Sequence, residues 1–439
     1  MLSAREAALS ALERCRRDGS WSGAAIDNII KKYGFERRDA ALACTMCLGV
    51  LQNSSYFDFL IDCYCSQKAD KLEPKLRDIL RLGIYQLLYL DKIPPRAAVN
   101  ETVQLCRNSS FSRASGLVNA VLRRVAENRD NLPEVPGKGS AEYLSIKYSH
   151  PLWLCKRLCE EKSYDFAEAF LRCNNSPAGL YIQVNRIKIS TKDYVRLLSE
   201  AGIYFEEDAE LDGCLLLRGG NVSELPGFEE GLFYVQDKAA RMAAELSMSA
   251  PGMAVLDACS APGGKSFAAA IKMNNSGSII SCDIHEKKLS LIRSGADRLG
   301  IEIIKTLAAD GRKQRQDFLQ AFDAVIADVP CSGLGVISKK PEIRQKSEFE
   351  ISSLPQIQLD ILRNLSDYPK VGGCLVYSTC TVLSEENEAV VLQFLKENKN
   401  YRLEACAVCG VDFENGMRTF WPNTDRTDGF FAARLVRIN

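Results

Sequence analysis

The chain has 439 residues, 46% of them hydrophobic, and its 56 Lys and Arg balance 56 Asp and Glu to a formal net charge of +0. This length allows about three domains with sizeable cores. No apolar run approaches the roughly 18–20 residues of a membrane span, and residues 1–6 lack the basic-then-apolar pattern of a signal peptide. We therefore expect a cytoplasmic protein without a membrane partner, in which the 17 cysteines are reduced thiols.

The first 130 residues or so repeat apolar side chains at three-and-four spacing, which is typical of amphipathic helices. The predicted helices are residues 4–17, 24–32, 37–52, 56–65, 74–90, 97–106 and 113–128. The run over residues 80–90 is too apolar for a surface helix, so we expect it at the centre. Residues 1–132 hold 20 Lys and Arg against 15 Asp and Glu, a mild bias toward a polyanionic partner.

A Pro- and Gly-rich linker, residues 130–140, separates this helical part from a small α+β segment that runs to about residue 235. The segment includes a short predicted strand at residues 181–186. It opens with Ser149-His150-Pro151. No acidic or nucleophilic motif lies next to His150 in the sequence, so we expect a capping or packing residue there rather than a catalytic one.

Strands and helices then alternate, which indicates a parallel sheet. The first strand, residues 253–256, ends at Asp257 and leads into a glycine turn and a helix. Glycines at such a turn let a ligand approach backbone N–H groups at the carboxyl edge of the sheet. The turn has neither GxGxxG nor P-loop spacing, and by itself it also fits a purely structural role.

Three of the following strands end in aspartate: Asp283, Asp310 and Asp328. Strand-end acids converge on the ligand crevice of a parallel sheet, although any one of them could instead cap a helix. Asp283 lies about 20–25 residues beyond the glycines, where an acid hydrogen-bonds ribose hydroxyls. The three acids and the glycine turn together favour a nucleotide-type cofactor site.

Two cysteines follow strands at the same edge, Cys331 in Asp328-Val329-Pro330-Cys331 and Cys380 in Ser378-Thr379-Cys380. C5 of cytosine becomes nucleophilic only after a thiolate adds at C6, so a pyrimidine C5 transfer requires such a thiol. Asp328 is the natural acid for N3 of the base. The sequence by itself leaves open which cysteine is the nucleophile.

Two further cysteine pairs have C-x-x-C spacing, Cys44/Cys47 and Cys406/Cys409. Both lie in apolar surroundings and neither has a second pair nearby, while the chain contains only two histidines. Tetrahedral zinc sites need four such ligands. We therefore expect small buried side chains here and no metal.

Over essentially its whole length the chain resembles the RsmB (Sun/Fmu) class of 16S ribosomal RNA cytosine-5 methyltransferases. Residues 94–101 and 116–124 resemble the NusB-type helical RNA-binding domain carried at the front of that class. The other matching motifs are the loop Asp257–Ser266, residues 328–333, residues 377–381, Glu385-Glu386-Asn387-Glu388 and Thr427-Asp428-Gly429-Phe430-Phe431.

The resemblance implies an α/β fold class: a Rossmann-like class I methyltransferase domain at residues 236–439, an all-α NusB-like domain at 1–132 and a small α+β domain at 141–235. It implies S-adenosylmethionine as cofactor, 16S ribosomal RNA as partner and a monomer. The residues implied to cradle the methionine part of the cofactor are Cys259, Ser260, Ala261, Pro262, Gly263, Gly264 and Lys265.

The resemblance also assigns roles to the acids and the two thiols. Asp283 would hold the cofactor ribose and Asp310 would lie beside the adenine. Asp328 would contact the target base and the methyl donor. Cys380 would be the nucleophile, and Cys331 would help to release the product.

The chain departs from the family pattern at Ser260, where an alanine is usual, and at Ser338, where a basic residue is common. The second departure leaves Lys339, Lys340 and Arg344 for phosphate contacts. Two alternatives remain open. The same chemistry could act on transfer RNA or large-subunit RNA, although relatives with those substrates generally lack the helical front domain. The chain could also be a non-catalytic RNA-binding assembly factor, which would predict decay of the cysteine motifs.

Overall fold

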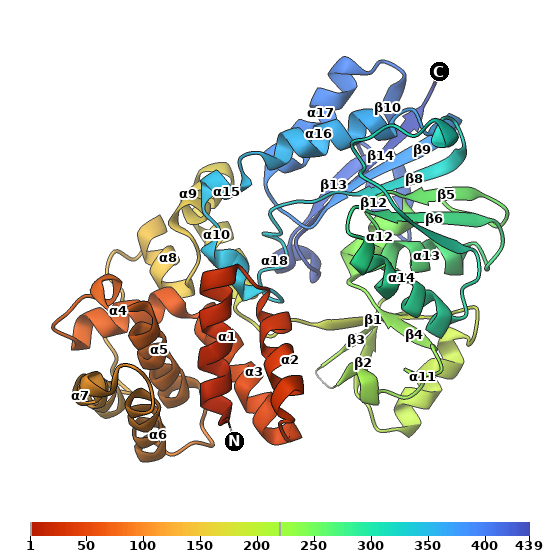
Figure 1. The fold of residues 1–439 in the computed structure, drawn as a ribbon. Helices are drawn as coiled ribbons and strands as arrows, with labels where there is room; N and C mark the ends of the chain where they lie inside the picture. Colours follow the sequence, from red (N-terminus) through yellow and green to blue (C-terminus); the bar gives the residue numbers. More distant parts are fainter. Residues whose placement is uncertain (1, 219–220) are drawn as a thin grey trace. The chain divides into compact units, whose positions relative to one another are not determined.

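A computed structural model describes residues 2–218 and 221–439, and the chain forms two compact units. Unit 1 consists of Met1–Pro177 together with Ile337–Glu348. Unit 2 consists of Ala178–Val336 and Phe349–Asn439. The chain thus leaves unit 2 after Val336, contributes a twelve-residue segment to unit 1 and returns to unit 2 (Figure 1).

Unit 1 is helical (Figure 1). Its helices are α1 (Ala4–Asp18), α2 (Ser22–Tyr33), α3 (Arg37–Gln52), α4 (Ser54–Tyr64), η1 (Ala69–Lys71), α5 (Pro74–Tyr89), α6 (Pro95–Arg107), η2 (Ser112–Ala114), α7 (Ser115–Glu127), α8 (Ala141–Tyr148), α9 (Leu152–Glu161), α10 (Tyr164–Asn174) and, in the returning segment, η5 (Pro341–Gln345). The seven helices predicted before residue 130 are confirmed, with ends displaced by at most two residues. Helix α6 begins earlier than predicted because Pro95 occupies its first turn, where proline's missing N–H costs nothing.

Helix α5 lies at the centre of unit 1, as its composition predicts, with ten buried residues. Two glycines permit its close packing. A Cβ on Gly49 of α3 would lie 2.1 Å from the Tyr85 ring, and one on Gly83 would lie 2.6 Å from Leu122 of α7. Side chains at either position would push the helices apart.

The first part of unit 2 is a four-stranded antiparallel sheet in the order β2-β3-β1-β4. Its elements are β1 (Leu180–Val184), α11 (Thr191–Glu200), β2 (Phe205–Glu207), β3 (Cys214–Leu217), η3 (Val222–Glu224) and β4 (Phe233–Val235). The strand predicted at residues 181–186 is confirmed as β1. Apolar residues of these elements form a small core of their own around Tyr194 and Phe233.

The second part of unit 2 is a sheet in the order β10-β14-β9-β8-β5-β6-β7, with β13 paired to β14. The five strands β7, β6, β5, β8 and β9 run parallel, as predicted, whereas β14 is antiparallel to β9, β10 and β13. The strands are β5 (Ala254–Asp257), β6 (Ser278–Asp283), β7 (Ile304–Ala308), β8 (Phe322–Asp328), β9 (Pro369–Thr379), β10 (Tyr401–Leu403), β13 (Met417–Phe420) and β14 (Phe430–Arg437). A separate hairpin joins β11 (Cys406–Val408) to β12 (Val411–Phe413).

Alternate strand residues face two helical layers, because successive side chains of a strand point to opposite faces. Val255 and Ile279 pack with α12, α13 and α14, while Leu256 and Leu375 pack with α16 and α17. The two layers lie on opposite sides of the sheet in Figure 1. The helices of this part are α12 (Lys238–Glu245), α13 (Gly264–Lys272), α14 (Glu286–Leu299), η4 (Gln316–Phe318), α15 (Glu348–Ile351), α16 (Leu354–Leu365), η6 (Ser384–Glu386), α17 (Glu388–Glu397) and α18 (Pro422–Asp425).

The strand order reverses at β5. The chain passes from β5 outward to β6 and β7, and then β8 pairs with β5 on its other side. The loops that leave β5 and β8 therefore diverge, which opens a crevice at the carboxyl ends of these strands. Among the described residues, no helix is both long and apolar enough to span a bilayer.

Candidate active site

The glycine turn joins the carboxyl end of β5 to the N-terminus of α13. Gly263 has φ +114°, a conformation that side chains disfavour, and its N–H donates to the Ser260 carbonyl over 2.6 Å. Ser260 is anchored to β6, because its N–H and Oγ both donate to the Cys282 carbonyl, over 2.7 and 2.9 Å. The serine that departs from the family pattern thus ties the loop to the neighbouring strand.

Asp257 lies beneath this loop and is completely buried. Ser266 Oγ of α13 donates to Asp257 Oδ2 over 2.7 Å and lies 2.7 Å from Ser281 Oγ of β6. Burial raises the pKa of the Asp257 carboxyl to about 7. Asp257 therefore fixes the start of α13 against the sheet rather than lining the crevice.

A cavity of about 350 Å³ opens at the carboxyl ends of β5, β6, β7 and β8, a volume typical of small-ligand sites. Five predicted cofactor residues line it: Cys259, Ala261, Asp283, Asp310 and Asp328. Ser260, Pro262, Gly263, Gly264 and Lys265 lie in the adjoining turn and in the first turn of α13, outside that lining.

The acids of the cavity are held in place by local hydrogen bonds. Asp283 Oδ1 accepts from the N–H of His285 over 2.8 Å. Asp310 forms an ion pair of 3.0 Å with Arg312, whose hydrogen bonds lower the pKa of the Asp310 carboxyl. Both carboxyl groups are therefore oriented by their own loops before any ligand binds.

The sequence prediction did not include the apolar wall of this cavity. Ile284, Ile357 and Ile361 line it, together with His285, Lys288, Arg312 and Pro330. Ile284 is 55% exposed, which is unusual for isoleucine and marks an apolar contact left open. Its position directly after a strand-end acid was the available sequence signal. Ile357 and Ile361, on α16, had none.

Asp328 at the end of β8 has a partner on each carboxylate oxygen. Lys265 Nζ donates to Oδ2 over 2.6 Å, and Ser378 Oγ of β9 donates to Oδ1 over 2.9 Å. Lys265 Nζ also lies 5.0 Å from the centroid of the Phe430 ring. Lys265, predicted as a cofactor ligand, is thus engaged with Asp328.

The two predicted cysteines meet at this edge of the sheet. Asp328 pairs in register with Ser378 on the neighbouring parallel strand, so the loops that follow β8 and β9 begin side by side. Cys331 Sγ and Cys380 Sγ are 3.2 Å apart. The pKa of the Cys331 thiol lies well above its ordinary value, chiefly because of its hydrogen bond with Cys380 and then because of burial.

The acidic motif after Cys380 holds the two thiol loops together. Glu386 Oε2 accepts from the Ser332 N–H and from Gln358 Nε2, each over 2.9 Å. Asn387 Nδ2 donates to the Thr381 carbonyl over 3.1 Å. Glu386 and Asn387 are nearly inaccessible to solvent. These residues orient the cysteines without touching the cavity.

The tail motif packs on the Cys331 loop through the backbone of Gly429. The Gly429 N–H donates to the Gly335 carbonyl over 2.8 Å, and a Cβ on Gly335 would lie 1.7 Å from the Gly429 oxygen. Asp237 accepts hydrogen bonds from Thr427 and Asp428. Gly429 thus contacts the thiol loop, whereas Thr427 and Asp428 bind the N-cap residue of α12.

Two predictions on unit 1 residues have different outcomes. His150 is buried, and burial with the Arg344 charge holds the pKa of its imidazole well below the ordinary value, consistent with a packing role. The prediction that Arg344 contacts phosphate is wrong. Arg344 is buried and donates to backbone carbonyls of unit 1, so it is not available to a polyanion. Lys339 and Lys340 are exposed.

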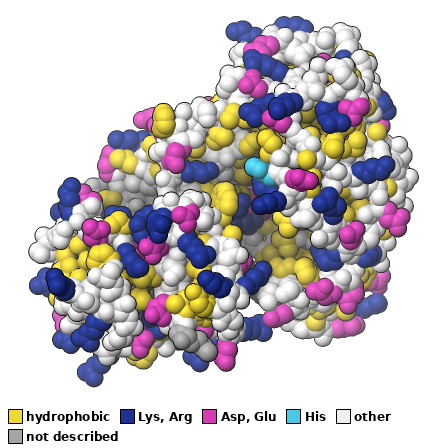
Figure 2. Space-filling view, in the orientation of Figure 1, with side chains coloured by type: hydrophobic (Ala, Val, Ile, Leu, Met, Phe, Trp, Pro, Cys, Tyr) yellow, Lys and Arg dark blue, Asp and Glu magenta, His cyan; other side chains and the backbone are white. Residues whose placement is uncertain are grey.

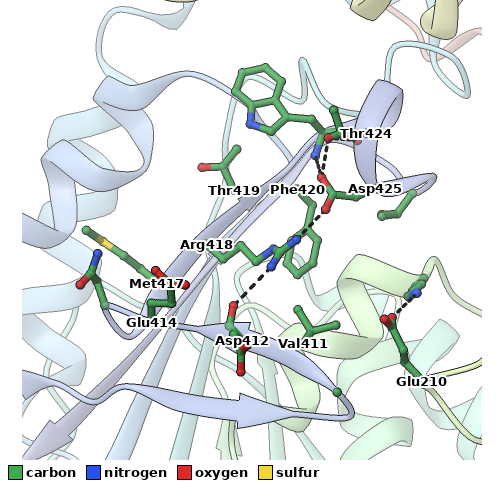
Figure 3. Close-up of a pocket in the computed structure, with 15 residues that line it drawn as sticks. Glu210, Val411, Asp412, Glu414, Met417, Arg418, Thr419, Phe420, Thr424 and Asp425 are labelled. Atoms are coloured by element: carbon green, nitrogen blue, oxygen red, sulfur yellow. Dashed lines mark hydrogen bonds and ion pairs between the residues drawn. The ribbon is translucent and has the colours of Figure 1, made fainter.

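A larger hollow, of about 830 Å³, lies around β12, β13 and α18 (Figure 3). Its cations are already paired: Arg418 with Asp425 at 2.8 Å, and Lys238 with Glu210 at 2.8 Å. None of the predicted catalytic or cofactor residues lines it. In the described part of the chain, no cluster of three or more His, Cys, Asp or Glu side chains is placed to hold a metal ion.

Three family models match the chain. The model of the 16S rRNA methyltransferase RsmB/F matches residues 246–436, that of the NusB family matches residues 2–127, and a ferredoxin-like domain of RsmF/B-like methyltransferases matches residues 150–223. The probable ribosomal RNA small subunit methyltransferase B of Bacillus subtilis (strain 168) is 32% identical over 99% of this chain and 98% of its own length.

Two other similarities extend over nearly the whole chain. The ribosomal RNA small subunit methyltransferase B of Citrobacter koseri is 33% identical and covers 91% of this chain and of its own. The crystal structure of PH0851 matches with a TM-score of 0.83 at 26% identity, over 99% of this chain and 98% of that one.

The reversed strand order, the glycine turn and these matches define an S-adenosylmethionine-dependent methyltransferase with a NusB domain in front of it. The chain belongs to the RsmB/F family of ribosomal RNA methyltransferases. The family and the fold class predicted from the sequence are thereby confirmed, whereas the residue ranges predicted for the three domains stay predictions.

Proposed function

We propose that this protein transfers a methyl group from S-adenosylmethionine to C5 of a cytidine in 16S ribosomal RNA, through a covalent bond between Cys380 and C6 of the base. The observation that carries the proposal is the pair of thiols 3.2 Å apart beside the cavity at the switch point. The names of the relatives support small-subunit RNA as the substrate. The proposal includes that the protein acts as a monomer in the cytoplasm.

The cavity suits a methyl donor of this kind. Its acids can bind polar ends: Asp283 the ribose hydroxyls and Asp310 the adenine edge. The isoleucines offer an apolar surface to the flat adenine ring. Residues 259–265 would hold the methionine part, and Asp328 would lie beside the methyl donor. When bound, S-adenosylmethionine supplies an electrophilic methyl group.

The arrangement of the thiols favours Cys380 as the nucleophile. In this proposal Cys331 keeps the proton that lies between the two sulfurs, in keeping with the raised pKa of its thiol. Loss of one proton from the pair then leaves the charge on Cys380, stabilised by the Cys331 S–H. Addition of that thiolate to C6 places carbanion character on C5, which can then accept the methyl group.

Asp328 would contact N3 of the bound cytosine. Its position between Lys265 and Ser378 keeps the carboxylate oriented, and the ammonium of Lys265 offers a proton beside it. A proton near N3 offsets the negative charge that the ring gains when the thiolate adds. The target base must leave its stack to reach this point.

Release of the product needs loss of the C5 proton and cleavage of the C6–sulfur bond. Once Cys380 is bonded to C6, it is no longer a thiolate that holds the Cys331 proton, and Cys331, adjacent to it, can lose that proton to solvent. The Cys331 thiolate then takes the C5 proton, whose electron pair forms the C5–C6 double bond as the C6–sulfur bond breaks. Cleavage returns Cys380 to the thiolate state and restores the aromatic ring. An enzyme without Cys331 is therefore expected to complete methylation but to remain attached to the RNA.

Transfer of labelled methyl from S-adenosylmethionine to unmodified 16S RNA tests the proposal, with wild type, Cys380→Ser and Cys331→Ser compared. We expect label at C5 of one cytidine, a loss of at least about 100-fold for Cys380→Ser, and a covalent protein–RNA adduct that accumulates with Cys331→Ser. Denaturing gel electrophoresis detects that adduct.

Full turnover by Cys380→Ser would eliminate the covalent mechanism. Label on transfer RNA or on large-subunit RNA, with none on 16S RNA, would keep the chemistry and replace the substrate. Tight RNA binding without any binding of S-adenosylmethionine by calorimetry would instead support a non-catalytic assembly factor.

A further inference from the structure

The connection between β8 and β9 carries more than Cys331. Beyond Val336 it becomes part of unit 1, as Ile337–Glu348, and forms the short helix η5 there. A loop of the methyltransferase sheet thus supplies surface to the helical unit. Two residues, Arg344 and Glu342, fix this segment within unit 1 and thereby set the positions of its lysines.

Arg344 anchors the segment at the ends of three helices. Its guanidinium donates to the carbonyls of Gln52, Tyr148 and Asn174, the last residues of α3, α8 and α10. Helix C-termini leave carbonyls unsatisfied and carry partial negative charge. Three such ends supply both the acceptors and the charge that a buried arginine needs.

Glu342 anchors the same segment to α2. Its two carboxylate oxygens accept from the N–H and the Oγ of Ser22, over 3.0 and 2.6 Å. Ser22 is the first residue of α2, and Trp21, which precedes it, offers no side-chain cap. A carboxylate at this helix N-terminus is favourable. Its hydrogen bond to the Ser22 N–H also holds the backbone next to Trp21 in place.

Trp21 is nevertheless 49% exposed. The ammonium groups of Lys340 and Lys346, at the two ends of η5, lie 4.6 and 5.9 Å from the centroid of its indole ring. Both α2 and the segment Ile337–Glu348 are held in place beside Trp21, yet they leave half of its side chain exposed. Hydrophobic burial alone does not account for a tryptophan in this position. A half-exposed indole ring with ammonium groups over it combines an aromatic surface with cations, the two features by which proteins stack the bases and bind the phosphates of single-stranded RNA.

Charge by itself does not mark where RNA would lie. On the face of unit 1 seen in Figure 2, Lys and Arg side chains are spread among acidic ones rather than gathered into one patch. The overall net charge is +0. Recognition of RNA therefore has to rest on local subsites that combine stacking with a few cations.

We propose that Trp21, Lys340 and Lys346 form a subsite for one unpaired nucleotide of the RNA substrate. The base stacks on the indole ring, and its flanking phosphates bind the two lysines. Arg344 and Glu342 are positioning residues that keep the lysines beside the ring. The inference rests on the proposed function, because it takes RNA as the substrate, but it shares no residue with the methyl-transfer cavity.

The subsite lies on the same chain segment as the thiol loop. Lys340 follows Cys331 by nine residues, and the intervening backbone is held by Gly335, whose N–H donates to the Cys380 carbonyl over 2.9 Å. The subsite and the loop that carries Cys331 are therefore joined by a short stretch of backbone. We expect the subsite to act on RNA affinity more than on the chemical step.

Binding of an oligouridine of about ten residues to the full-length protein tests the subsite directly. This probe contains no cytidine, so it cannot occupy the methyl-transfer pocket as a substrate. The chain has three tryptophans, and comparison of wild type with Trp21→Phe isolates the fluorescence of Trp21. We expect quenching of the Trp21 signal on titration, and a dissociation constant about tenfold higher for Trp21→Ala.

Trp21→Phe should retain affinity within about threefold, because phenylalanine keeps a stacking face. Tyr33→Ala is the matched control: Tyr33 is 48% exposed at the far end of the same helix, and its neighbour in sequence, Lys32, lies over its ring. An equal loss for Tyr33→Ala, or unchanged affinity for Trp21→Ala, overturns the subsite.

Lys340→Gln tests the phosphate contact through its salt dependence. One lost phosphate contact should lower the slope of log Kd against log salt by about 0.7 for single-stranded RNA. Lys71→Gln, which removes a cation that pairs with Asp70, should leave the slope unchanged. Identical slopes for wild type and Lys340→Gln would remove the lysine from the proposal.

Steady-state methylation of 16S RNA separates this inference from the proposed function. If wild type methylates the RNA, Trp21→Ala should raise KM about tenfold and leave kcat and the affinity for S-adenosylmethionine unchanged; a fall in kcat alone contradicts the subsite. If wild type transfers no methyl to RNA, the proposed function fails, and the oligouridine titration still decides whether Trp21 binds a nucleotide.

Discussion

At the scale of single residues, the neighbours of each side chain at the site come from other strands and helices. Cys331 and Cys380 each follow a strand, and their 3.2 Å separation makes them a hydrogen-bonded pair. Lys265 of α13 likewise donates to Asp328 at the end of β8. In each case the fold brings together two groups that the sequence separates by tens of residues.

Asp257 yields a pH prediction at this scale. Its pKa is raised to about 7 in the folded protein, from an ordinary value of 3.8, because it is buried. The folded state therefore holds the proton more tightly than the unfolded state. The contribution of Asp257 to the free energy of unfolding is therefore fully present below about pH 4. It is lost as pH rises to about 7, which lowers the free energy of unfolding by a few kcal/mol.

Urea unfolding between pH 4.5 and about 7.5 for wild type and Asp257→Asn measures this effect. Asparagine keeps an acceptor for Ser266 but does not titrate, so the variant should gain stability relative to wild type as pH rises. Parallel stability curves for the two proteins would mean that Asp257 titrates normally. Ser266→Ala serves as a control that disturbs the same contact without removing the acid.

At the scale of elements, the N- and C-termini of helices carry much of the organisation. The glycine turn leads into the start of α13, Glu342 accepts hydrogen bonds at the start of α2, and Arg344 donates to the ends of α3, α8 and α10. Ser149 at the C-cap of α8 has φ +53° and accepts from the Tyr56 N–H of α4 through its Oγ. The Ser149 carbonyl also accepts from the Arg344 guanidinium, so the Ser149-His150-Pro151 motif lies among the acceptors that surround Arg344.

Removal of the guanidinium should therefore destabilise unit 1. We expect Arg344→Met to lower the free energy of unfolding by about 2–4 kcal/mol, because several buried helix-end carbonyls lose their donor at once. Arg344→Lys should recover part of this, since an ammonium keeps the charge but not the planar fork. Thermal unfolding measures both.

Arg363→Met is a suitable comparison, because Arg363 is partly exposed and pairs with Asp360 and Glu397 on the surface. Its loss should cost no more than about 1 kcal/mol. An Arg344→Met protein as stable as Arg363→Met would show that water replaces the guanidinium as the donor to the helix-end carbonyls.

At the scale of the whole molecule, the two units are not separate stretches of chain. Unit 1 is incomplete without the segment Ile337–Glu348, which lies between β8 and β9 in the sequence. The thiol loop and the proposed nucleotide subsite are therefore covalent neighbours even though one belongs to unit 2 and the other to unit 1. A cut at residue 177 does not release an intact helical unit.

A fragment of residues 1–177 should unfold at a lower temperature than the same residues do in the full chain, because the ends of α3, α8 and α10 lose Arg344. We expect a synthetic peptide of residues 337–348 to raise the melting temperature of this fragment by several degrees at saturation. A peptide with Arg344→Met should have little effect. Equal stabilisation by both peptides, or by neither, would contradict the anchoring role of Arg344.

The sequence by itself determined the helices of the front part, the parallel strands, the glycine turn and the acids and cysteines at strand ends. These signals are local: apolar periodicity specifies each element, and a parallel sheet brings the carboxyl ends of its strands to one edge. The motifs also carried the resemblance that identified the family, because they keep the residue types that the chemistry requires.

Only the tertiary structure decided which residues far apart in the sequence contact one another. Arg344 was expected to contact phosphate because Ser338 stands where a basic residue is common, which left the nearby cations for that role. Arg344 is instead buried among helix ends up to 292 residues away in the sequence. Ile357 and Ile361 reach the cavity from a helix with no motif. Burial and hydrogen-bond partners depend on packing between distant elements, and a local pattern does not encode them.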